Sequence, residues 1–378
     1  MAGTRLTARR LNRATLQRQL LLRRERIGVV DAVRRAVALQ AQEAASPYLA
    51  MWNRVDGFDP AELDAAFASH AVVKATLMRS TLHAVAAEDY PVLHAAMVRS
   101  LRAARLGDHR FVSTGLSSAD ADALVPHVLE FAAQPRTNAE VEALVAQRLG
   151  EPHPRAWWAL RTFAPLVHAP TGGPWSFGRR PAYLAAPTQP PRPTPLDHDE
   201  CASRLVRRYL EGFGPATVAD IAQFSLLART KVRQALAGEL ERFEGPDGAE
   251  LFDVPGAPLP AEDTPAPARL MAMWESVLLA YADRSRVIPP DYRKLVIRNN
   301  GDVLPTLLVD GHVAGVWRPV DGGIEATAFH PLPDQAWCEL AAEAGALLAF
   351  LAGREPAVYS RYARWWQTLP AAETRVLT

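Results

Sequence analysis

The sequence predicts a mostly α-helical α+β protein, with three tandem winged-helix (helix-turn-helix) units and a C-terminal antiparallel β-barrel-like domain. Two observations lead to this prediction. Helical patterns recur in groups of three, and each group is followed by a short strand-like segment, which is the order of a winged helix. In the last third of the chain, Asn-Gly and Asp-Gly turns instead separate strand-like runs at regular spacing.

Four domains are expected from this pattern in a chain of 378 residues. The three units are predicted at residues 1–115, 116–190 and 191–262, and the β-rich domain at 263–378. Proline-rich stretches at 187–195 and 254–267 are predicted to be linkers or extended crossings, because proline fixes φ and removes a backbone donor.

The first unit begins with helical patterns and ends with a hairpin and a long helix. Helices are predicted over 8–22, 29–41, 60–69 and 88–106, and strands over 72–78 and 81–86. Asp59 suits the N-cap of the helix that begins at Pro60, since proline is accepted in the first turn.

The second and third units repeat this order. Helices are predicted over 118–133, 137–150 and 154–168 in the second unit, and over 199–211, 217–227 and 229–242 in the third. Thr137 with Glu140 forms a capping box, and Gly150 is a helix stop. The third unit is predicted to end with a turn and a strand at 244–254.

The C-terminal domain is predicted to start with an apolar helix over 269–284. Strand-like runs follow at 294–298, 307–309 and 313–317, separated by turn signals. A second helix is predicted over 334–352, and an aromatic tail at 362–366 is expected to pack against the domain.

Composition excludes several classes of protein. The chain is 49% hydrophobic and 22% charged, which excludes wholesale disorder. Two cysteines are too few for a disulfide framework or a C-x-x-C metal site. The start of the chain lacks the apolar core of a signal peptide, and no apolar stretch is long enough to span a membrane. We therefore expect a cytoplasmic protein without a membrane partner.

Charge is concentrated near the start of the chain. The net charge is +1, yet residues 1–35 hold ten arginines against Glu25 and Asp31, a local charge of +8. Such a segment is typical of a surface that meets a polyanion. The alternative is a solvated helix face.

Motifs of several common chemistries are absent. The sequence has no phosphate-binding G-x-x-x-x-G-K-[ST], no nucleophile elbow G-x-S-x-G and no H-E-x-x-H. The ten histidines do not pair at ligand spacing, so neither a metal nor a cofactor is expected.

A pair of glutamines, Gln40 and Gln42, lies at the end of the second predicted helix, before the helix start at Ser46-Pro47. Residues two apart share a side only in extended chain. The pair could therefore converge on one site only if the helix ended near Gln40. The alternative is a polar helix end without function.

Five segments, taken in order and spacing, resemble the AlkZ/YcaQ-like bacterial DNA glycosylases over nearly the whole chain. This winged-helix family includes self-resistance enzymes of actinomycetes that make DNA-alkylating antibiotics. The segments are 38–42 (ALQAQ), 77–83 (LMRSTLH), 212–221 (GFGPATVADI), 274–284 (WESVLLAYADR) and 308–318 (LVDGHVAGVWR).

The resemblance implies a monofunctional DNA glycosylase whose catalytic residues are Gln40 and Gln42. Its substrate would be double-stranded DNA with alkylated purines, chiefly N7-alkylguanine, with N3-alkyladenine, bulky adducts and interstrand crosslinks as further candidates. No cofactor is implied, and we expect a nucleoid-associated monomer.

The implied chemistry is physically reasonable, because N7-alkylguanine is cationic and leaves without a general acid. Glutamine is no strong base, but its carbonyl oxygen can orient water and face an oxocarbenium-like sugar. Gln42 stands where broader-acting members carry aspartate, which favours labile cationic lesions. Glu43 is a rival candidate for the missing base. Glu275 stands where we expect aspartate.

Candidate DNA contacts lie in three places. The first hairpin and the third helix of the third unit are typical sites of phosphate or groove contact, and the first helix qualifies by position. The candidates are Arg79, Thr81 and His83; Arg229, Lys231 and Arg233; and Arg9, Arg10 and Arg13.

Two other functions stay open. The first is a non-catalytic winged-helix DNA-binding protein or transcriptional regulator, since fold does not fix function. A regulator should prefer one DNA sequence, whereas a glycosylase should release a base irrespective of sequence. The second is a scaffold with an unrelated small-molecule activity, for which no residue set is evident.

Overall fold

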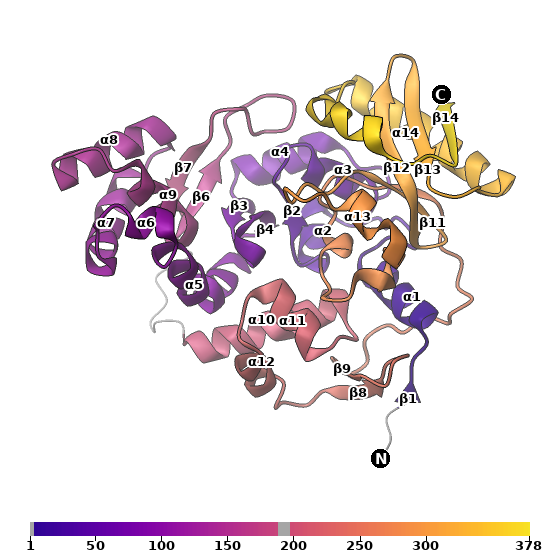
Figure 1. Ribbon diagram of the computed structural model, residues 1–378, viewed down its shortest axis with the longest axis horizontal. Coiled ribbons are helices and arrows are strands. Elements are labelled where there is room, and N and C mark those ends of the chain that lie inside the picture. Colours follow the sequence, from indigo (N-terminus) through magenta and orange to yellow (C-terminus); the bar gives the residue numbers. More distant parts are fainter. Residues whose placement is uncertain (1–3, 188–196) are drawn as a thin grey trace.

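The computed structural model describes residues 4–187 and 197–378 and has the expected mixed α+β character (Figure 1). Its elements lie around a central region that contains β2 and β4, with α7–α9 on one side, α10–α12 on another and the C-terminal sheet on a third. The predicted linker at 187–195 lies almost wholly outside the described residues.

The first part of the chain contains short helices, a hairpin and a long helix. Its helices are α1 (Ala8–Arg18), α2 (Val29–Arg35), α3 (Ser46–Trp52), α4 (Pro60–Ala68), α5 (Tyr90–Leu106) and α6 (His109–Val112). Its strands are β1 (Thr4–Arg5), β2 (Leu39–Gln40), β3 (Val72–Thr76) and β4 (Leu82–Ala86), with a 3-10 helix at Met78–Ser80. The predicted N-cap Asp59 accepts from the N–H of Ala61.

The next two parts follow the predicted order of three helices and a hairpin. The second contains α7 (Ser118–Phe131), β5 (Arg136–Thr137), α8 (Asn138–Leu149), α9 (Pro154–Phe163), β6 (Leu166–Ala169) and β7 (Ala182–Ala185). The third contains α10 (His198–Phe213), α11 (Val218–Ser225), α12 (Arg229–Ala235), β8 (Glu241–Glu244) and β9 (Glu250–Asp253). The capping box of Thr137 and Glu140 is present, and Gly150 ends α8 in the left-handed conformation.

The hairpins join across the parts. One six-stranded sheet has the order β2-β4-β3-β6-β7-β5, and β3 meets β6 where Lys74 lies opposite His168. A three-stranded sheet, β1-β8-β9, brings Thr4 beside Phe243. The first and second hairpins therefore share a sheet instead of forming separate wings.

The C-terminal part corrects the predicted barrel. Its strands β10 (Arg269–Leu270), β11 (Thr306–Val309), β12 (His312–Val320), β13 (Gly323–Ala328) and β14 (Glu373–Leu377) form an open sheet in that order. Among the described residues, its end strands β10 and β14 do not pair with each other, so the sheet is not closed. The helix α14 (Asp334–Ala352) packs on this sheet, as predicted, and the aromatic tail lies in a 3-10 helix at Ser360–Thr368.

Two C-terminal elements were predicted wrongly. The expected helix 269–284 consists instead of β10, extended chain and a 3-10 helix at Ser276–Leu278. Residues 269–281 are all buried, so an apolar run there has no period that distinguishes a helix from other structure. The expected strand 294–298 contains a short helix, α13 (Arg293–Val296).

Several predicted helices also end early, after Arg18, Arg35, Phe163 and Ala235. The end of α2 matters most, because it releases the glutamine segment from the helix. Val37 has a φ of 67°, which a β-branched residue in an α-helix cannot adopt.

Candidate active site and nucleic-acid interface

The glutamine segment is extended. Leu39 and Gln40 form β2, which pairs with β4 so that Gln40 lies opposite His83. The N–H of Ala41 continues the ladder by donating to the carbonyl oxygen of Leu82 at 2.8 Å. The requirement derived from the sequence is therefore met, because the helix ends before the pair.

Gln42 is exposed, but its side chain is held at one end. Its Oε1 accepts a hydrogen bond from the backbone N–H of Leu82 at 2.8 Å. A carboxamide oxygen has two lone pairs, so one acceptor position and the whole NH₂ group stay available. Gln42 can thus orient a water molecule from a fixed position.

Gln40 lies behind this surface and is only 3% exposed. The amide orientation that satisfies its neighbours places Nε2 3.2 Å from the carbonyl oxygen of Leu82, to which it donates. In the same orientation Oε1 accepts from a guanidinium nitrogen of Arg79. Both glutamines therefore hydrogen-bond to the backbone of Leu82.

His83 is buried beside Gln40 and faces the interior. Its Nδ1 lies 3.0 Å from the carbonyl oxygen of Thr81. Burial, reinforced by the charge of Arg79, lowers the pKa of His83 to about 3. The imidazole is therefore neutral near pH 7 and presents no surface to a nucleic acid. Thr81 itself uses its hydroxyl to bond the carbonyl oxygen of Met78 at 3.0 Å.

Arg79 points inward from the connection between β3 and β4, where its φ is 55°. Its guanidinium lies 5.4 Å from the ring centre of Phe224, and its Nη1 has no hydrogen-bond partner within the described ranges. Burial, reinforced by the charge of Arg284, lowers the pKa of Arg79 to about 10. The side chain thus contributes positive charge behind Gln40, where we had considered a phosphate contact.

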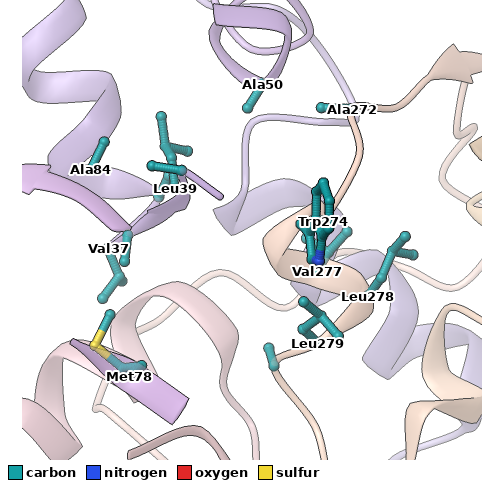
Figure 2. Close-up of a cluster of buried hydrophobic side chains, with 14 of the residues drawn as sticks. Val37, Leu39, Ala50, Met78, Ala84, Ala272, Trp274, Val277, Leu278 and Leu279 are labelled. Atoms are coloured by element: carbon teal, nitrogen blue, oxygen red, sulfur yellow. The ribbon is translucent and has the colours of Figure 1, made fainter. Parts of the chain in front are cut away.

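A buried layer supports the glutamine segment from below. Figure 2 shows Val37 and Leu39 beside Met78 and Ala84 in a buried cluster that also includes Trp274 and its neighbours. The hydroxyl of Ser276 donates to the carbonyl oxygen of Ala38 at 2.8 Å, two residues before Gln40.

Glu275 belongs to the same layer. Its carboxylate accepts from the N–H of Ser276 at 2.8 Å and pairs with Arg54 at 2.7 Å. Both charged side chains are fully buried. The glutamate found in place of the expected aspartate therefore forms a structural ion pair under the site.

Glu43, the rival base, is already engaged. Its carboxylate forms an ion pair with Arg361 and accepts from the hydroxyl of Tyr362 at 3.0 Å. Both partners come from the C-terminal 3-10 helix. The carboxylate of Glu43 is thus neutralised beside Gln42.

Two pockets meet at Gln42, with volumes of about 360 and 370 Å³. Both are lined by Gln42, Lys74 and Phe177, and Glu43 lines only the second. Sequence reasoning missed Lys74. The signal was present, because a lysine interrupts the apolar strand Val-Val-Lys-Ala-Thr at 72–76.

The other candidate DNA contacts lie apart from the glutamines. Arg229 and Arg233 are exposed on α12, and their guanidinium groups have no ion pair or hydrogen bond to the residues that the structure describes. Lys231, from the same helix, is paired with Asp199 at 2.8 Å.

Two arginines of α1 pair with the turn between β11 and β12. Arg9 pairs with Asp310 at 2.7 Å. Arg13 pairs with the same carboxylate, and its side chain is fully buried. Arg10 is half-buried. The structure thus brings Gln40, Gln42, Arg79, Thr81 and His83 together and places the α1 and α12 arginines elsewhere.

Two general features complete the description. In the part of the chain that the structure describes, no helix has the length and apolar character needed to cross a membrane. Over the same residues, no three side chains of His, Cys, Asp or Glu are grouped as metal ligands would be.

Comparison with known proteins places this chain among the DNA glycosylases, enzymes that cleave the bond between base and sugar. Residues 33–350 match the model of a family described as DNA glycosylase AlkZ-like. The chain belongs to this AlkZ-like family, and the family resemblance seen in the sequence is confirmed.

Two relatives come from Streptomyces sahachiroi. An interstrand DNA cross-link repair glycosylase is 31% identical over 144 residues, which span 35% of this chain and 38% of the relative. The solved structure of the DNA glycosylase AlkZ matches with a TM-score of 0.76 and 22% identity, over 90% of this chain and 95% of that one. This structural match shows a shared fold.

Proposed function

We propose that this protein is a monofunctional DNA glycosylase that hydrolyses the N-glycosidic bond of cationic N7-alkylguanine. One observation supports this proposal above the others. Gln42 is exposed where two pockets meet, and the Leu82 N–H fixes its carboxamide. This is the arrangement needed to position water without a carboxylate base.

The substrate supplies the activation of the leaving group. Its positively charged base departs as a neutral purine, so no general acid is required. The oxygen of Gln42 accepts a hydrogen bond from the attacking water and faces the cationic sugar. Gln40, which is buried, acts as a positioning residue that ties β2 to β4 under Gln42.

The exposure of Gln42 also bears on substrate size. A bulky adduct does not need to enter a closed pocket to bring its sugar to this residue. We therefore include N3-alkyladenine, natural-product adducts and interstrand crosslinks in the proposed substrate class, and the printed name of the S. sahachiroi relative agrees with the last.

We propose that the three helix–hairpin parts act on DNA as modified winged-helix units, the first two with their hairpins joined in one sheet, and that the protein works as a monomer. Arg229 and Arg233, exposed on α12, are the proposed phosphate contacts of the third unit. The alternative of a sequence-reading regulator has less support, because it gives the glutamine pair no task.

The test is base excision from a duplex with one N7-alkylguanine, read as strand breaks after heating in alkali. Gln42→Ala should lower the excision rate by about 100-fold or more, as removal of a transition-state contact does. Gln40→Ala should lower it as well, because Gln42 then loses the support that positions it. Gln335→Ala, on exposed α14 surface, is the matched control. Breaks at the spontaneous level with the unaltered protein, despite DNA binding, would reject the glycosylase in favour of the regulator.

A further inference from the structure

The first pocket beside Gln42 is lined by cations without counter-ions. It lies between β3, α9 and the β6–β7 hairpin, and its volume is about 360 Å³. The cations Lys74, Arg105, Arg161 and Arg179 line it together with His168, and no aspartate or glutamate does among the described residues. Such a concentration of one sign of charge creates a strong positive potential.

Lys74 is the most unusual of these residues. It is 6% exposed, and its ammonium lies 4.5 Å from the ring centre of Phe177. Within the described ranges it makes no hydrogen bond or ion pair. A buried charge is normally paired, because the loss of its hydration is otherwise uncompensated. Burial also lowers the pKa of Lys74 to about 8, so the group is still mostly charged at pH 7.

The two arginines deeper in the pocket have neutral partners. Arg105 donates to the hydroxyl of Thr162 at 3.1 Å and lies 4.7 Å from the ring centre of Trp158. Arg161 donates to Asn138 Oδ1 at 3.3 Å and to the hydroxyl of Tyr183 at 3.2 Å. These contacts orient the guanidinium groups. Asp108 acts on the charge of Arg105 from nearby, but its carboxylate is paired with Arg110.

His168 shows the consequence of this crowding. Burial, with the charges of Lys74 and Arg161, lowers its pKa to about 3, so it stays neutral. The N-terminal arginines differ from the cations of the pocket, because they pair with carboxylates of distant segments. The described residues therefore provide no anion for the positive charge of this pocket.

We propose that this pocket binds a backbone phosphate of the DNA strand that carries the target nucleotide, with Lys74 as its central ligand. The inference rests on the proposed function, and it adds a subsite that fixes the register of the strand. Gln42 lies on the rim of the same pocket, so a phosphate held by Lys74 would anchor the strand beside the reacting sugar.

Binding to a duplex with a stable abasic-site analogue tests this without base excision. Lys74→Met should weaken binding about tenfold or more, as loss of a charge-assisted contact does. The slope of log Kd against log salt should fall by about 0.9 for one lost phosphate contact. Lys294→Met, on exposed surface of α13 outside both pockets, should change neither quantity.

A neutral methylphosphonate placed at single positions near the analogue identifies the phosphate. The methylphosphonate should weaken binding of the unaltered protein at one position only. At that position it should cause no further loss of binding by the Lys74→Met variant. Inorganic phosphate alone, added to the unaltered protein, should compete only weakly with binding of the DNA. This result would separate a strand phosphate from a free one.

Protein stability separates a ligand from a structural residue. Removing an unpaired buried charge should leave the melting temperature of Lys74→Met unchanged or higher, whereas loss of a structural residue should lower it. Arg179→Gln, at the exposed lip, repeats the binding test if Lys74→Met does not fold. An unchanged Kd and an unchanged salt slope in both variants would overturn the phosphate proposal. If the binding effects were present but the unaltered protein excised no base, only the proposed glycosylase function would be overturned.

Discussion

His83 illustrates how a single residue in this site is controlled by burial. It is 1% exposed beside Gln40 and Arg79, and its pKa is lowered to about 3. In the unfolded chain the pKa of this histidine returns to its ordinary value near 6.5. Between these values the unfolded state binds one proton more than the folded state, so the free energy of unfolding decreases as the pH falls below about 6.5.

We therefore expect His83→Gln to flatten the pH dependence of stability. Between pH 6 and 5 the slope of unfolding free energy should decrease by about 1.4 kcal/mol per pH unit, the value for one proton. Urea denaturation at several pH values measures it. His109→Gln, at a side chain 89% exposed, is the control. Parallel pH profiles for His83→Gln and the unaltered protein would contradict the assignment of a buried neutral imidazole.

At the scale of elements, the site depends on how α10 meets the glutamine segment. Gly212 lies in α10, and a Cβ there would overlap the side chain of Val37 and lie 3.2 Å from Gln19 Nε2. Val37 already has a left-handed backbone, which is unfavourable for a β-branched residue. The segment therefore has little freedom to move away.

Gly212→Ala should consequently displace the glutamine segment. We expect a loss of about 1 to 3 kcal/mol of stability, typical of overpacking, and a larger fall in excision rate than stability alone explains. Gly353→Ala is the control, because a Cβ there meets nothing within 4 Å. Chemical denaturation and single-turnover excision provide the two readouts. Equal rates for both variants would show that α10 does not control the segment.

Elements with local signals were predictable from the sequence. Capping boxes at Thr137 and Thr217 and the start at Ser46-Pro47 mark helices whose beginnings the structure confirms. The segment 269–281 had no such signal, since all of its residues are buried. The same limit applies to the site. The extended glutamine pair could be reasoned out, whereas the β2–β4 pairing and the pocket around Lys74 depend on contacts between distant residues.

At the scale of the whole molecule, most arginines near the start of the chain form ion pairs within the fold. These ion pairs reach the third part, the C-terminal part and other segments of the first part. They join Arg5 to Glu244, Arg9 and Arg13 to Asp310, Arg18 to Asp253, Arg24 to Glu343, Arg26 to Asp56, Arg34 to Glu88 and Arg35 to Glu25. Six carboxylates outside residues 1–35 take part in these pairs, so the local charge of +8 is largely neutralised within the fold. It is less available to a polyanion than the composition suggests.

These ion pairs should differ in how much they stabilise the fold, according to their burial. The side chains of Arg18 and Asp253 are 2% and 0% exposed, and the pair joins α1 to the end of β9. Removing one partner leaves a buried charge without compensation, so Asp253→Asn should cost about 3 to 5 kcal/mol. Arg26→Ala, at a side chain 89% exposed, should cost less than about 1 kcal/mol.

A double variant separates the charge from the packing. Arg18→Met with Asp253→Leu removes both charges and retains apolar volume, so it should recover much of the stability lost in Asp253→Asn. Urea denaturation of all four proteins measures these differences. If Asp253→Asn cost no more than Arg26→Ala, the buried pair would not hold α1 in place. The concentration of arginines at the start of the chain would then need an external partner, and DNA would again be the first candidate.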